Sequence, residues 1–173
     1  MGKGFKGTAV PLFITFTDMI QQETIVKLIE KYLSDNSLFL VDAVVSPDND
    51  IEVTFDSMDK VDLKNCIELS KTIEAGLDRE LEDFSLTVTS AGLDQPFKVF
   101  RQYQKFIGKE VEVVFKSGNK QKAVLTDALE DSIELSFFKN EKVEGKKKKE
   151  KIEVRQFYSL NEIKSTKPVI NFK

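Results

Sequence analysis

The stretch LTVTSAGLDQPF, from Leu86 to Phe97, separates two kinds of sequence pattern. Before it, apolar residues at helical spacing alternate with strand-like runs, and after it nearly every apolar period is two. Inside it, Leu86 and Val88 continue a strand, whereas Gly92 and Pro96 interrupt the pattern. We therefore predict an N-terminal domain, then a linker with a short helix, then a C-terminal domain. Their predicted bounds are 19–91, 92–108 and 109–173.

Two amphipathic helices are expected in the N-terminal domain. The first, at about 19–34, carries apolar residues at helical spacing, namely Ile25, Leu28, Ile29, Tyr32 and Leu33. Asp18 and Gln21 have the spacing of a capping box for its start. The second covers about 63–77, with Asp62 or Asp59 as its cap. The lone cysteine, Cys66, lies on its apolar stripe and is interpreted as a small core residue.

Three strands complete this domain. Residues 37–45 and 51–55 read as two strands of a hairpin, joined by the turn-rich run Pro47–Asp50, and 84–89 reads as a third. The resulting order, α-β-β-α-β, favours a three-stranded sheet covered on one face by two helices.

The C-terminal domain is predicted to consist almost entirely of strands. Alternating apolar residues indicate strands at 111–115, 121–129, 133–137 and 152–154, with a final turn or strand around 157–163. A charged loop is expected at 139–150. Short strands joined by tight turns favour a small closed β-barrel, which leaves no exposed sheet edge. The predicted fold class is α+β.

The net charge of −3 hides a division between the two halves. Residues 19–97 hold 17 Asp or Glu against 6 Lys or Arg, whereas 98–173 hold 18 Lys or Arg against 11 Asp or Glu. Such a division suggests two surfaces for partners of opposite charge. Charge that merely keeps the protein in solution is the alternative interpretation.

The composition argues against most enzyme classes. The chain has no histidine and one cysteine, so Ser-His and Cys-His pairs are excluded, there is no disulfide framework, and the commonest zinc ligand besides cysteine is missing. No Walker sequence, nucleophile elbow or calcium loop is present, and no segment is apolar enough to span a bilayer. We predict no catalytic, cofactor or metal site. Residues 1–18 look unlike the rest and are interpreted as a mis-assigned start or a disordered extension.

The sequence resembles the ribosome maturation factor RimP family. The stretch quoted above is similar to the family signature VSSPGLDRPL, and FIGKEV at 106–111 follows as in the family. The second helix, VDLKNCIELSKTIEAGLD at 61–78, is similar to a family helix of the type DDC…SR…LD. Ala91 and Gln95 stand where the family usually has Pro and Arg, which places an anionic contact of that Arg in doubt.

The resemblance implies an N-terminal α/β domain joined to an Sm-like or SH3-like β-barrel. It also implies a monomeric bacterial protein of the cytoplasm, without a membrane partner, that binds the immature small ribosomal subunit and promotes its maturation. The implied partners are ribosomal RNA and a basic small-subunit ribosomal protein near the decoding centre. Two alternatives stay open: an Sm-like RNA-binding regulator independent of the ribosome, and a metal-dependent RNA-processing enzyme.

The candidate RNA contacts are lysines of the C-terminal half. They form two groups: Lys146, Lys147, Lys148, Lys149 and Lys151, and Lys116, Lys120 and Lys122. The alternatives are a solvated loop for the first group and protection of a sheet edge for the second. Most of the 14 Phe residues are assigned to the core, and Phe138 and Tyr158 are the candidates for base stacking.

The family motif Gly92, Leu93, Asp94 and Pro96 is expected to set the angle between the domains first and to touch a partner second. Gly92 is expected to adopt a backbone conformation that other residues disfavour, and Asp94 to cap the following turn.

Overall fold

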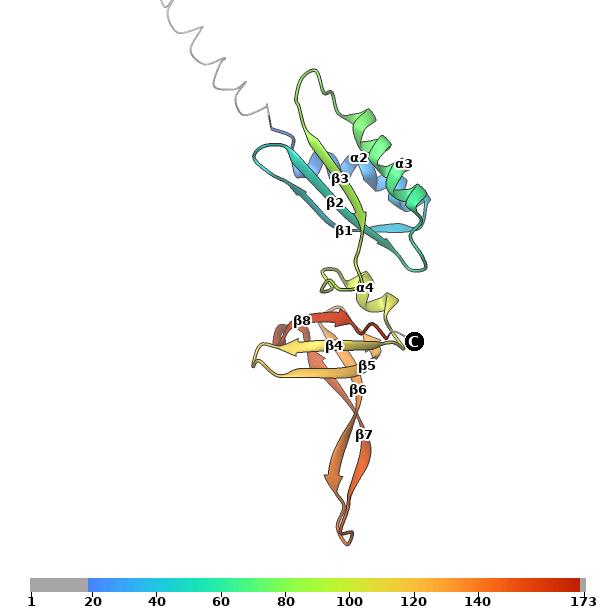
Figure 1. Cartoon of the computed structure of the whole chain (residues 1–173), viewed down its shortest axis with the longest axis vertical. Helices are drawn as coiled ribbons and strands as arrows, with labels where there is room; N and C mark the ends of the chain where they lie inside the picture. Colours follow the sequence, from blue (N-terminus) through green and yellow to red (C-terminus); the bar gives the residue numbers. More distant parts are fainter. Residues whose placement is uncertain (1–18, 172–173) are drawn as a thin grey trace, which may run out of the picture. The chain divides into compact units, whose positions relative to one another are not determined.

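The computed structural model describes residues 19–171, and the chain divides between Ala91 and Gly92 into two compact units. We call residues 19–91 the N-terminal unit and 92–171 the C-terminal unit. The described residues form three α-helices, one 3-10 helix and two β-sheets (Figure 1). The mixed α+β class predicted from the sequence is therefore confirmed. The extension predicted at 1–18 lies outside the described residues.

The N-terminal unit contains one mixed sheet with strand order β1-β2-β3. Its elements are α2 (Gln22–Asp35), β1 (Leu38–Val45), β2 (Asp50–Ser57), α3 (Leu63–Gly76) and β3 (Ser85–Ser90). β1 and β2 form an antiparallel hairpin, whereas β2 and β3 are parallel. A parallel pair needs a crossover connection, and α3 supplies it between β2 and β3.

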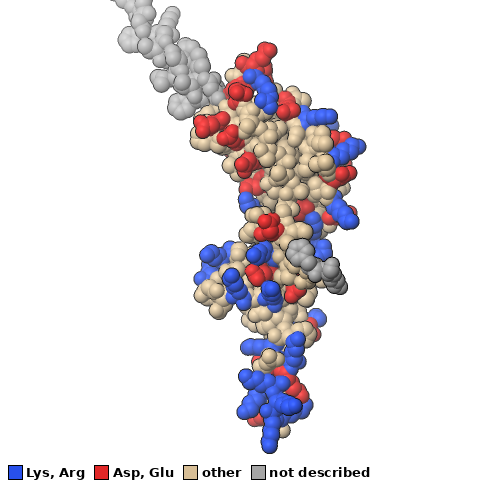
Figure 2. All heavy atoms as spheres, viewed as in Figure 1, with Lys and Arg blue, Asp and Glu red and all other residues tan. Residues whose placement is uncertain are grey.

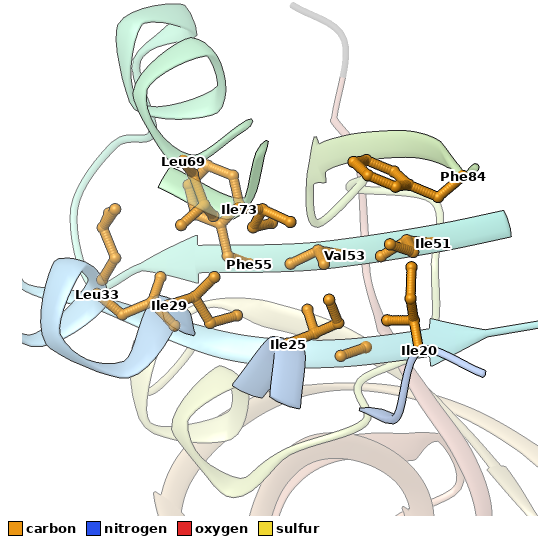
Figure 3. Close-up of a cluster of buried hydrophobic side chains, with 12 residues drawn as sticks. Ile20, Ile25, Ile29, Leu33, Ile51, Val53, Phe55, Leu69, Ile73 and Phe84 are labelled. Atoms are coloured by element: carbon orange, nitrogen blue, oxygen red, sulfur yellow. The ribbon is translucent and has the colours of Figure 1, made fainter. Parts of the chain in front are cut away.

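Apolar side chains of both helices meet the same face of this sheet (Figure 3). Ile25 and Ile29 of α2 and Leu69 and Ile73 of α3 are fully buried, and they pack around Phe55 of β2. Full burial of one such side chain contributes about 1.5–3 kcal/mol. The helical spacing that predicted both helices therefore marks their buried faces. Cys66 is half-buried and packs against this core, as predicted.

The two helices begin differently. The Asp62 side chain accepts a hydrogen bond from the Lys64 amide, and Asn65 Oδ1 accepts one from the Asp62 amide, which makes a capping box at α3. The N-cap of α2 is Gln21, with no side-chain cap bond. The capping box predicted with Asp18 as N-cap is thus wrong, because the helix begins three residues later.

The C-terminal unit is built on a five-stranded antiparallel sheet in the order β7-β6-β5-β4-β8. Its elements are α4 (Phe100–Lys105), β4 (Glu110–Phe115), β5 (Lys120–Ala128), β6 (Ser132–Lys142), β7 (Lys149–Ser159), the 3-10 helix η1 (Leu160–Glu162) and β8 (Ile163–Pro168). Val111, Leu125 and Leu135 are fully buried at its centre. The Tyr103 hydroxyl on α4 donates to Thr166 Oγ1 at 3.2 Å, which fastens α4 to β8.

The closed barrel that the sequence predicted is not found among the described strands. η1 carries the chain away from β7, and β8 then pairs with β4, so β7 has only β6 as a ladder partner. Register shifts between Leu125 and Asp127 and between Val114 and Phe115 bend the strands locally. They do not bring β7 and β8 into a hydrogen-bonded pair, so the sheet keeps two edges.

The charged loop predicted at 139–150 is half strand, so its predicted bounds are also wrong. β6 continues to Lys142 and β7 starts at Lys149, so only 143–148 form the connection. Charged residues without apolar alternation lack a strand pattern. Pairing between the two strands nevertheless continues to the end, because the backbone ladder does not depend on which side chains it carries.

Replacing Asp62 with Ala should lower the free energy of unfolding by about 1 kcal/mol, because the start of α3 loses its side-chain acceptor. Asp59→Ala is the matched control, since it removes the other carboxyl that the sequence offered as a cap and should change stability little. Urea unfolding followed by far-UV circular dichroism measures both variants. Equal losses in the two would contradict the capping role of Asp62.

Candidate nucleic-acid interface

The far end of the β6–β7 hairpin carries the densest positive charge of the C-terminal unit. Residues 139–151 hold seven Lys against three Glu. Figure 2 shows Lys and Arg side chains gathered over this end. The connection turns through Gly145, whose φ of +87° lies in the left-handed region that favours glycine. We call residues 142–149 the hairpin tip.

The tip lysines differ in their partners. Lys146 forms an ion pair with Glu150 across the turn. Within residues 19–171, no ion pair involves Lys147, Lys148 or Lys149, and all three are exposed. Lys142 and Lys149 face each other in the ladder, which places like charges side by side. The tip is therefore a site where an anion would relieve repulsion.

The second group of predicted lysines does not stay together. Lys116 and Lys120 flank the β4–β5 turn and line a groove of about 600 Å³ with Lys139 of β6. Lys122 lines other hollows, together with Glu110 and Glu112. The sequence-predicted contacts therefore fall on three places: the tip with Lys151 next to it on β7, the groove, and the surface around Lys122.

The surface around Lys122 carries mixed charge. Glu153 and Arg155 of β7 lie on it, 3.5 Å apart between carboxylate and guanidinium. The Ser136 hydroxyl donates to Glu153 at 2.6 Å, and this hydrogen bond, followed by the Arg155 charge, holds the pKa of Glu153 below its usual value. Glu153 stays negative there, so this surface attracts an anion less than the tip does.

The aromatic side chains proposed for base stacking are in different surroundings. Phe138 is 60% exposed, with the Lys151 ammonium 4.8 Å from its ring centroid. Tyr158 is half-buried, and its ring centroid is 5.0 Å from that of Phe115. Phe157 is 50% exposed, although its type assigned it to the core. Phe157 and Tyr158 are neighbours on β7, so their side chains point to opposite faces of the strand.

The groove itself was missed from the sequence. Its aromatic lining comes from Phe115, Phe137 and Tyr158, which belong to three different strands. A usable signal was present: Lys139 and Gln156 have the same strand phase as the core residues beside them. A polar residue on the inward phase marks the place where the core ends and solvent begins.

The family motif begins at the junction between the two units. Gly92 has no positive φ, so the predicted backbone role is wrong; a Cβ there would instead meet Asp94 Oδ1 at 2.7 Å. The Gln95 amide donates to the Gly92 carbonyl, and the Gln95 side chain donates to Asp94 Oδ2. Leu93 and Pro96 are exposed. The interdomain role of the motif stays a prediction.

Two kinds of feature are absent from residues 19–171. No group of three or more His, Cys, Asp or Glu side chains between 19 and 171 is arranged to hold a metal ion. No helix in that range is long and apolar enough to cross a membrane.

Comparison with known proteins gave a consistent set of relatives, although no family model matches the chain. A ribosome maturation factor RimP of Porphyromonas gingivalis is 39% identical over 131 residues, which cover 76% of this chain and 86% of the relative. The protein of that name from Christiangramia forsetii is 41% identical over 117 residues, 67% of this chain and 76% of the relative. A third, from Flavobacterium psychrophilum, is 40% identical over 96 residues.

Replacing Lys147, Lys148 and Lys149 together with Gln should flatten the salt dependence of RNA binding. Each lost phosphate contact lowers the slope of log affinity against log salt by about 0.7–0.9, so three contacts give roughly 2–3. The matched control replaces Lys27, Lys31 and Lys71 with Gln, which changes the net charge equally but lies on α2 and α3. Titration of labelled ribosomal RNA at several salt concentrations measures the slopes. Identical slopes would show that the tip is only solvated.

Proposed function

The chain belongs to the ribosome maturation factor RimP family, and from this we propose that it is an assembly factor that binds the immature small ribosomal subunit. The observation that carries the proposal is the 39% identity over most of a relative of that name. The relatives' names give the process, and the small subunit is our inference. The factor acts by binding and not by catalysis.

The hairpin tip supplies the RNA contact in this proposal. Its lysines are exposed, and beyond Phe138 the paired strands carry no buried side chain. A positively charged, protruding ladder can lie along phosphates without displacing core packing. Lys116, Lys120 and Lys139 add a second positive region at the groove.

The N-terminal unit supplies a contact of opposite sign. It holds 16 Asp or Glu against 6 Lys or Arg, and Figure 2 shows acidic side chains over it. The β1–β2 turn and the α3–β3 loop meet through the Asn49 side chain, which donates to the Asp83 carbonyl at 3.3 Å. These loops and the first residue of β2 together carry six carboxylates that we call the acidic end: Asp48, Asp50, Asp78, Glu80, Glu82 and Asp83. We assign this end to a basic small-subunit ribosomal protein near the decoding centre.

Binding alone is enough to promote maturation. If the protein binds one conformation of the maturing subunit more tightly than another, it shifts the population toward that conformation by its differential affinity. With a negatively charged partner on the C-terminal unit and a positively charged partner on the N-terminal unit, the protein would hold an RNA segment and a ribosomal protein at once. The gain in avidity then depends on both contacts being made together.

A tagged copy of the protein should migrate with free small subunits in a sucrose gradient of cell lysate, and should be depleted from translating ribosomes. Cells that lack the protein should accumulate unprocessed small-subunit RNA. The triple Lys147, Lys148 and Lys149 variant should shift toward the top of the gradient, whereas the control triple should not. Wild-type protein that stays at the top at low salt would refute the proposal.

Reversing charge at the acidic end should weaken binding of the basic ribosomal protein. Glu80→Lys with Glu82→Lys removes attraction and adds repulsion, so the dissociation constant should rise at least tenfold, about 1.4 kcal/mol. Glu23→Lys with Glu30→Lys on α2 is the control with the same change in net charge. Calorimetric titration of purified small-subunit proteins into each variant gives the comparison. If both pairs weaken binding equally, only net charge matters and the acidic end has no special role.

A further inference from the structure

The groove of the C-terminal unit combines aromatic rings with polar side chains. It lies where the β4–β5 turn, the inward phase of β6 and β7, and η1 come together. Its volume, about 600 Å³, is within the roughly 300–1,000 Å³ of sites for small organic ligands. A groove of this size admits one flat group, not a double helix.

Its aromatic residues leave a ring surface for that group. Phe115 and Tyr158 contact each other with ring planes 54° apart, and Phe137 lines the same groove from β6, four residue pairs along the ladder from the pair that contains Tyr158. All three are half-buried, so each is held by the core and still reached from the groove. Burial, and then the Glu162 charge, raise the pKa of Tyr158, so its hydroxyl remains a neutral donor at physiological pH.

The rim supplies positive charge and amide groups. Lys116 and Lys120 stand on the β4–β5 turn, and Asn161 and Gln156 bring side chains that both donate and accept hydrogen bonds. The acidic side chain in the lining is Glu162, and its carboxylate already accepts from the Ser159 amide at 3.2 Å, where it caps η1. The groove therefore favours an anionic ligand with a planar polar ring.

We propose that this groove binds an unpaired nucleotide of RNA, with the base against Tyr158 and Phe137 and its phosphate near Lys116 and Lys120. The inference rests on the proposed function in taking RNA as the partner, and adds that the RNA is single-stranded at this contact. Paired bases are already stacked on both faces and cannot enter, whereas an unpaired base offers a free ring face and a polar edge. A peptide segment without acidic residues would satisfy the rings but would leave the lysines without an anion.

The test compares two RNAs on the full-length protein: a short oligouridylate or oligoadenylate, and a fully paired hairpin of equal charge. Tyr158→Leu should weaken binding of the single strand about 5- to 150-fold, the range of one base–aromatic stack. Phe157→Leu is the matched control, next in sequence and on the opposite strand phase. Because the chain has no Trp, tyrosine fluorescence is a direct second measurement: the single strand should quench it, and Tyr158→Phe should remove most of that quenching.

Binding of the paired hairpin reports whether each variant is still folded. Tyr158→Leu that loses the single strand and keeps the hairpin supports the inference. Two outcomes overturn it. In the first, Tyr158→Leu binds neither RNA, while Asn161→Ala and Gln156→Ala keep the wild-type quenching of tyrosine fluorescence by the single strand. In the second, Tyr158→Leu binds both RNAs as tightly as the wild-type protein. If wild-type protein does not prefer the single strand, and Tyr158→Leu nevertheless dissociates from the small subunit in the gradient, the groove binds a protein segment and the inference is wrong. Failure of the proposed function differs from all of these, since wild-type protein would then be absent from small subunits whatever the oligonucleotides do.

Discussion

The ladder between β6 and β7 joins eleven residue pairs, from Ser132 with Ser159 to Lys142 with Lys149, and both candidate surfaces of the C-terminal unit depend on it. Its first half lies over the core and positions Phe137 and Tyr158 at the groove. Its second half has no core beneath it and carries the tip. An isolated two-stranded hairpin is marginal in water, so the tip is held by continuation of a ladder that the core has already anchored.

The sequence predicted the elements whose side chains are sorted by burial. Ile25, Ile29 and Leu33 on α2 reveal their helix because every third or fourth residue must face the sheet, and Asp62 reveals the start of α3 because the helix needs an acceptor there. Where nothing is buried, that signal vanishes. Residues 139–142 and 149–151 form strands only because the residues next to them in the chain already form strands. No local property of their Lys, Glu or Asn residues predicts this.

The candidate site was predicted in part, for a related reason. The lysine-rich tip is visible as composition, but the distribution of Lys116, Lys120 and Lys122 over different surfaces depends on how strands bend and pair. The groove depends on something still less local. The closed barrel that was expected would have an interior filled by side chains. A sheet with two edges instead leaves the end of its inner face open to solvent beside Tyr158. Only long-range pairing decides between those outcomes.

The position of the tip also bears on the timing of an encounter. From Phe138 to Lys142 the strand advances about 14 Å, at roughly 3.4 Å per residue. That exceeds the screening length of about 8 Å at physiological ionic strength. The tip lysines are thus electrostatically independent of the core from which they project. An approaching polyanion would be captured first at the tip, and the slower adjustments at the sheet would follow. Salt would then act mainly on the rate of capture, and ring contacts mainly on the residence time.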